Sequence, residues 1–117
     1  MLALDAQGRV LLVRHAYGPP KWMPPGGGMK RGEDPIPASQ RELAEELGCT
    51  LANPRVVAQS VDTLHGAGNV LHIVAGQCLG TPRPDQREII EARFFAPDAL
   101  PQDAVRGLDT LLVRWLA

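Results

Sequence analysis

Three glutamates, Glu42, Glu45 and Glu46, are spaced so that their carboxylates could act together. On a helix at 100° per residue, Glu46 lies about 40° from Glu42 and Glu45 about 60° to the other side, so all three share one face. Such like charges destabilise a helix, and anions near its C-terminal end oppose the macrodipole. Either the face is simply solvated, with Arg41 paired to Glu45, or the carboxylates have a chemical role.

The residues ahead of these glutamates favour a chemical role. Gly26, Gly27 and Gly28 would let a ligand approach the backbone, whose N–H groups can meet phosphate oxygens, and Arg14 and Lys30 add positive charge nearby. Three carboxylates would repel a phosphate unless a hard dication stood between them. Mg²⁺ suits that position because it takes oxygen ligands from carboxylates and substrate, and Mn²⁺ is a candidate substitute. Loop and helix together predict a site for a magnesium-complexed diphosphate.

A helix over residues 35–47 must position the glutamates. Asp34 is a typical N-cap, Pro35 suits the first helical position, and Gly48 is a natural C-terminal stop. The side opposite the glutamates is apolar and predicts packing against a core, through Ile36, Leu43 and Leu47.

The remaining elements predict a mixed α/β sheet. Leu2 to Leu4 and residues 10–13 form a hairpin around a turn at residues 5–8, and the first strand is short. Further strands are expected near residues 55–61 and 70–79 and before Phe95. A last helix from about Asp103 presents one apolar stripe, made of Val105, Leu108, Leu112 and Trp115.

Length and composition limit the class of protein. A chain of 117 residues is expected to form one domain, residues 1–117. A net charge of −1 argues against stable nucleic-acid binding, which needs a basic surface. No apolar stretch approaches the ~20 residues that cross a bilayer, so we expect a cytoplasmic protein without membrane contact. Cys49 and Cys78 lie in apolar patterns typical of inert buried thiols.

The same residues resemble the box of the Nudix hydrolase family, which includes the MutT-like enzymes. That box reads Gly, five residues, Glu, seven residues, then Arg-Glu-apolar-any-Glu-Glu-any-Gly-apolar. Its fixed positions are filled here by Gly27, Glu33, Arg41, Glu42, Leu43, Glu45, Glu46, Gly48 and Cys49. Weaker similarity, at residues 8–14, 22–27 and 91–101, extends the resemblance over most of the chain.

The resemblance implies a fold and an activity. The fold would be an α/β/α sandwich around a mixed sheet, here with a shortened first strand. The activity would be Mg²⁺-dependent hydrolysis of a nucleoside diphosphate linked to another moiety. By the resemblance Glu45 and Glu46 bind metal, Glu42 is a third ligand or the base that activates water, and Arg41 orients the glutamates. Glu33 and Gly48 would support the box.

A further base or ligand in this family often comes from a later glutamate. Glu91 is the first choice and Glu88 the second, since both precede Phe95, although either could be an exposed strand-edge charge. The base therefore stays open among Glu42, Glu88 and Glu91.

Other functions remain open at this stage. A domain that binds a nucleotide without turning it over is the main alternative, and a structural domain with an acidic helix is a third. The intact set of glutamates favours catalysis. The expected partner is a small-molecule nucleotide of unspecified kind, and a homodimer is compatible with the sequence.

Overall fold

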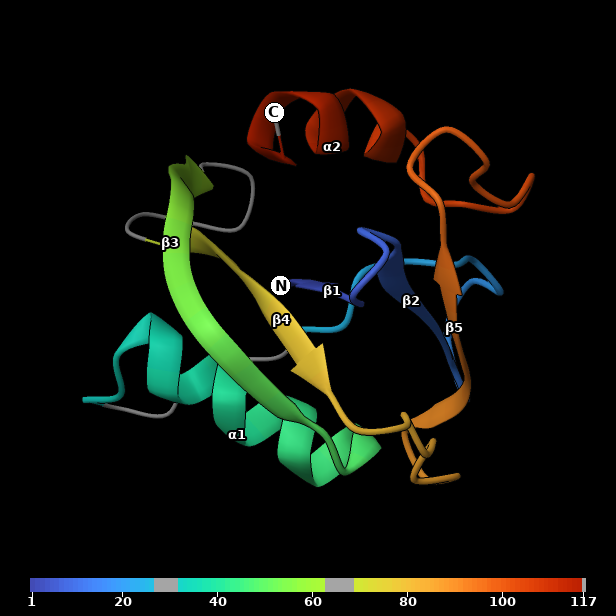
Figure 1. The fold of residues 1–117 in the computed structure, drawn as a ribbon, viewed down its shortest axis with the longest axis horizontal. Coiled ribbons are helices and arrows are strands. Elements are labelled where there is room, and N and C mark those ends of the chain that lie inside the picture. Colours follow the sequence, from blue (N-terminus) through green and yellow to red (C-terminus); the bar gives the residue numbers. More distant parts are fainter. Residues whose placement is uncertain (27–31, 63–68, 117) are drawn as a thin grey trace.

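The computed structural model describes residues 1–26, 32–62 and 69–116. A five-stranded sheet has the order β3-β4-β1-β2-β5, in which β1 and β4 are parallel and the other neighbours are antiparallel (Figure 1). The sheet is therefore mixed, as predicted. Its strands are β1 (Leu2–Leu4), β2 (Val10–His15), β3 (Thr50–Asp62), β4 (Asn69–Leu79) and β5 (Ile89–Phe95), and the helices are α1 (Pro35–Leu47) and α2 (Leu108–Leu116).

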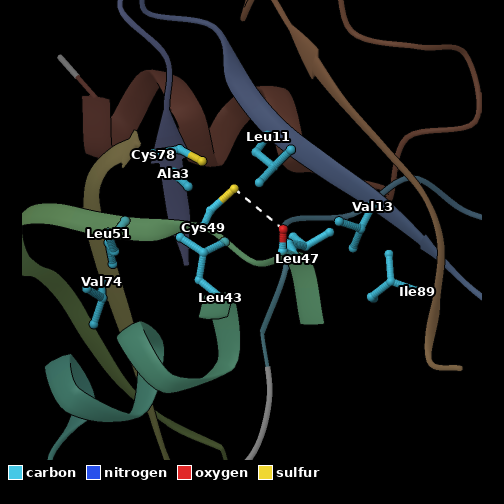
Figure 2. Close-up of a cluster of buried hydrophobic side chains, with 10 residues drawn as sticks. All are labelled: Ala3, Leu11, Val13, Leu43, Leu47, Cys49, Leu51, Val74, Cys78 and Ile89. Atoms are coloured by element: carbon cyan, nitrogen blue, oxygen red, sulfur yellow. Dashed lines mark hydrogen bonds between the residues drawn. The ribbon is translucent and has the colours of Figure 1, made fainter. Parts of the chain in front are cut away.

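The two helices cover opposite sides of the sheet (Figure 1). Strand β2 shows why, because successive side chains of a strand point to opposite faces. Leu11 and Val13 pack in the cluster that contains Leu43 and Leu47 of α1 (Figure 2), whereas Val10 and Leu12 pack in the cluster that contains Leu108 and Leu112 of α2. The architecture is the predicted α/β/α sandwich, and its first strand has three residues.

Helix α1 begins and ends where the sequence predicts. Asp34 occupies the N-cap with extended backbone angles, although its side chain makes no capping hydrogen bond. Gly48 ends the helix in the left-handed conformation, with φ of 68°, and donates to the carbonyl of Ala44 at 3.0 Å. Leu43 and Leu47 are fully buried. The apolar side of α1 therefore faces the sheet.

The predicted start of the last helix is wrong, because α2 begins at Leu108 and not near Asp103. The backbone of the preceding residues bonds instead to Trp22, whose N–H donates to the Asp103 carbonyl at 3.0 Å and whose carbonyl accepts from Val105 at 2.8 Å. Gly107 then adopts φ of 83°, which no α-helix contains. The apolar stripe still packs on the sheet, with Leu108 and Leu112 buried.

Strand β3 is longer than the predicted segment near residues 55–61. It starts at Thr50, because the pairing with β4 continues past an irregularity between Ala52 and Arg55. The irregularity contains Asn53, with φ of 49°, and Pro54. Bulges are among the places where a sheet tolerates proline.

Both cysteines are buried and free, as the sequence predicts. Cys49 Sγ lies 3.6 Å from the carbonyl oxygen of Leu47 (Figure 2). Burial raises the pKa of the Cys78 thiol to about 12. Neither helix among the described residues is long and apolar enough to cross a membrane.

Gly76 provides a test of the packing between β3 and β4. A methyl group on Gly76 would lie 2.9 Å from both the Ala52 carbonyl oxygen and the Leu51 side chain. We expect Gly76→Ala to lower the free energy of unfolding by about 1–3 kcal/mol, because the sheet must shift to admit it. Urea denaturation measures this change.

The control is Gly26→Ala, whose added methyl would meet nothing nearer than the Met1 nitrogen at 4.0 Å. It should change the free energy of unfolding by no more than about 0.5 kcal/mol. Equal midpoints for Gly76→Ala and the wild type would contradict the packing described.

Candidate functional site

The three glutamates of α1 line one cavity of about 680 Å³. The opposite wall is formed by the segment that precedes β5, so residues distant in the sequence meet here. The lining residues are Glu42, Glu45, Glu46, Asp85, Arg87 and Glu88. The helix thus brings Glu42, Glu45 and Glu46 together, and of the two later glutamates it is Glu88 that joins them.

Arg41 connects the start of the box to the acidic face of α1. Its Nε and Nη2 donate to the two carboxylate oxygens of Glu33, at 2.8 and 2.9 Å. Its Nη1 donates to Glu42 at 3.0 Å and to Glu45 at 3.2 Å. Hydrogen bonding to Glu33 raises the pKa of the Arg41 guanidinium further above its ordinary value. Arg41 is therefore a fixed cation that orients two of the three glutamates of the cavity.

Glu46 differs from the other two glutamates of α1 because it is buried. It is 6% exposed, and its Oε2 has no hydrogen-bond partner among the described residues, whereas the Glu45 side chain is 57% exposed. Burial, together with the neighbouring carboxyl groups of Glu42 and Glu88, raises the pKa of Glu46 to about 8. An unpartnered buried carboxylate is costly unless a proton or a cation satisfies it.

The donor set of this cavity fits a hard divalent cation. Every acidic group that lines it offers carboxylate oxygen, the donor that Mg²⁺ and Mn²⁺ prefer, and Glu46 Oε2 is without a partner. As placed, no three histidine, cysteine or acidic side chains within the described ranges converge closely enough to hold an ion. Glu42 and Glu45 are instead turned toward Arg41.

Glu91 and Arg14 lie away from the cavity. They face each other across β5 and β2, with Arg14 Nη1 3.2 Å from Glu91 Oε1. The Arg14 guanidinium lies 5.6 Å from the ring centre of Trp22, which belongs to the cluster that packs on α2. This pair therefore occupies the face of the sheet opposite α1, and Arg14 is engaged by side chains of the protein.

The proposed phosphate loop is described only in part. Gly26 is exposed, whereas Gly27, Gly28 and Lys30 lie outside the described residues. Asp85 and Arg87 were not predicted for the site. The sequence indicates only a turn here, because residues 81–84 are rich in proline and proline and aspartate favour turns. Nothing in the sequence relates that turn to α1.

The raised pKa of Glu46 predicts how pH changes stability once divalent cations are removed. A carboxyl group whose pKa is higher in the folded than in the unfolded chain binds more protons in the folded chain. The free energy of unfolding therefore falls as the pH rises from about 4.5 to about 8. In EDTA, Glu46→Gln should be more stable than the wild type at pH 8 by at least ~1 kcal/mol. The difference should shrink toward pH 5. Urea denaturation across this range measures it.

Glu45→Gln removes an exposed carboxylate from the same helix and is the matched control. It should keep the loss of stability toward pH 8, because Glu46 is still present. Parallel profiles for Glu46→Gln and the wild type would show that Glu46 is not held in the environment described.

Comparison with known proteins shows the family of this chain. The NUDIX domain family matches residues 1–116. Among solved structures, a MutT NUDIX hydrolase from Burkholderia pseudomallei is 28% identical, with a TM-score of 0.70 over 96% of this chain and 92% of that one. The MutT protein from Methanosarcina mazei Go1 has the same fold, with a TM-score of 0.73 at 22% identity over 97% of this chain and 88% of that one.

Curated relatives match a shorter stretch. An RNA pyrophosphohydrolase from Rhodospirillum rubrum is 40% identical over 48 residues, which is 41% of this chain and 29% of that protein. The enzyme of the same name from Saccharophagus degradans is 40% identical over 57 residues, 49% and 34% of the two chains. The matched stretch thus spans about a third of each relative. Since the family match covers almost the whole sequence, the chain belongs to the Nudix hydrolase family, as its box residues predicted.

Proposed function

We propose that this protein is a Mg²⁺-dependent pyrophosphohydrolase that cleaves a nucleoside diphosphate linked to another moiety by attack of water at phosphorus. The observation that carries the proposal is Glu46, a buried carboxylate with an unpartnered oxygen, on a cavity lined by further carboxylates. Glu42, Glu45 and Glu46 would hold the ion, with Mn²⁺ as an alternative. When bound, such an ion neutralises charge on phosphoryl oxygens and lowers the pKa of coordinated water.

The residues of the chain would divide the remaining work. Arg41, held by both oxygens of Glu33, orients Glu42 and Glu45 and limits their mutual repulsion. Gly48 ends α1 two residues after Glu46 and so fixes where the acidic face stops. Gly26, Gly27, Gly28 and Lys30 are proposed to bind the phosphates, together with Arg14 if its pairing with Glu91 opens.

The proton of the attacking water needs an acceptor on the cavity wall. Glu42 and Glu88 both line the cavity, and a general base must lie within hydrogen-bond reach of its proton. Glu91 stays a prediction from the sequence, but its position beside Arg14 gives it less support. We propose Glu88 as the later glutamate of the site.

The proposed substrate is a class of compounds and not a single compound. The cavity volume is within the range of pockets that hold nucleotide-sized ligands. We propose a small-molecule nucleotide as the substrate and a cytoplasmic location. Because the curated relatives are named for RNA, a 5′-triphosphorylated oligonucleotide belongs in the substrate panel beside nucleoside triphosphates, nucleotide sugars and dinucleotide polyphosphates.

The direct test is hydrolysis by the Glu46→Gln variant. We expect the wild type with Mg²⁺ to release a nucleoside monophosphate or pyrophosphate from at least one member of the panel. Glu46→Gln should lose about 10²-fold or more in kcat, because the amide keeps the shape but not the charge that would bind the ion. Chromatography of the products measures both.

The control is Asp98→Asn, which removes one exposed carboxylate from the turn after β5 and should keep activity within about two-fold of the wild type. No turnover with Mg²⁺ or Mn²⁺, combined with a nucleotide-dependent rise in melting temperature, would support a binding or sensor domain instead.

A second comparison decides which later glutamate acts in the reaction. Glu88→Gln should lower kcat by about 10²–10⁴-fold, the usual contribution of a general base. Glu91→Gln should lower it by less than about five-fold, because only the ion pair with Arg14 is lost. Steady-state kinetics at saturating Mg²⁺ gives both values, and the reverse order of effects would assign the role to Glu91.

A further inference from the structure

The backbone that carries Glu88 is held by one carboxylate. Asp85 Oδ1 accepts hydrogen bonds from three successive backbone N–H groups, those of Arg87 at 3.0 Å, Glu88 at 3.0 Å and Ile89 at 2.9 Å. The bonds from Ile89 and Arg87 are the main ones that lower the pKa of Asp85 below its ordinary value, so the acceptor stays ionised near neutral pH. A single side chain thus binds all three backbone N–H groups of residues 87–89.

The same segment contains a strained residue. Gln86 has φ of 62°, a conformation that residues with a side chain rarely adopt. Its N–H donates to the carbonyl of Ile89 at 2.9 Å, which closes the turn. A conformation of this kind persists only where surrounding bonds impose it, and here the bonds to Asp85 do so.

Both ends of the segment are attached to elements that frame the cavity. The Arg83 N–H donates to the carbonyl of Leu47, the last residue of α1, at 2.9 Å. The Ala16 N–H, just after β2, donates to the carbonyl of Glu88 at 2.8 Å. The backbone of Glu88 is thus bonded on both sides, through its N–H to Asp85 and through its carbonyl to Ala16, and its side chain lines the cavity together with Glu46.

We propose that Asp85 is a positioning residue that acts through Glu88, by holding the backbone of residues 87–89 so that the Glu88 carboxylate faces the glutamates of α1. This proposal rests on the proposed function. Because geometric misplacement by about 1 Å can cost 10²-fold in rate, loss of the three hydrogen bonds should impair turnover more than substrate binding.

The test is a double-mutant cycle with a conservative rescue. Asp85→Ala should lower kcat by about 10–100-fold and change KM by less than about three-fold. Asp85→Asn, which keeps an oxygen acceptor at the same place, should stay within about five-fold of the wild type. The double variant Asp85→Ala, Glu88→Gln should have a kcat within about three-fold of that of Glu88→Gln alone, because the residue that Asp85 positions is already inactive.

A second measurement follows the turn without using activity. Amide hydrogen exchange at Arg87, Glu88 and Ile89 should be at least about ten-fold faster in Asp85→Ala than in the wild type, and Asp85→Asn should restore most of the protection. Melting temperatures establish that each variant is folded. If Asp85→Ala unfolds, Asp85→Asn takes its place in the cycle, measured alone and combined with Glu88→Gln. Losses of kcat that multiply in the combined variant would then overturn the proposal.

Three further results would overturn the proposal: wild-type kcat in Asp85→Ala, losses that multiply in the double variant, or an Asp85→Asn variant as slow as Asp85→Ala. Failure of the proposed function is recognised separately, because the wild type would then show no turnover. In that case unchanged amide exchange in Asp85→Ala would also refute the claim that Asp85 holds the backbone of residues 87–89. Faster exchange at the three amides would support that claim without supporting a role in catalysis.

Discussion

The buried carboxylate of Glu46 is the constraint on which the rest of the site depends. A carboxyl group that is removed from water beside Glu42 and Glu88 must either keep its proton or meet a cation. Arg41 provides positive charge to Glu42 and Glu45 and also pairs with Glu33. Among the described residues Glu46 Oε2 has no hydrogen-bond partner, and an ion that prefers oxygen ligands would satisfy its charge.

The fold keeps this arrangement in place from the apolar side. Leu43 and Leu47 bury α1 against the sheet, and the same helix presents its carboxylates to the cavity. The carbonyl of Leu47 also receives the Arg83 N–H, so packing of the helix fixes the opposite wall of the cavity as well. Stability and function thus depend on the same helix. Its apolar side holds it against the sheet, and this packing fixes the positions of the carboxylates on its acidic side.

The sequence predicted the parts that depend on local pattern. The bounds of α1, the common location of its three glutamates and the two apolar layers followed from helical spacing, alternation and capping residues. The start of α2 was missed because Asp103 and Val105 bond to Trp22, a partner about eighty residues away in the chain. Spacing also could not tell Glu88 from Glu91, because Glu88 lies in the turn before β5, whose conformation depends on the hydrogen bonds to Asp85. The burial of Glu46 likewise depends on tertiary packing.

The proposed activity requires that the carboxylates of α1 bind a divalent ion. Crystals grown without divalent cations and then soaked in MnCl₂ test it most directly, by anomalous difference density at the manganese edge. We expect a peak in direct contact with the carboxylate of Glu46 and within reach of Glu42 or Glu45. Soaked crystals with no peak at Glu46, and with Glu42 and Glu45 still bound to Arg41, would contradict it.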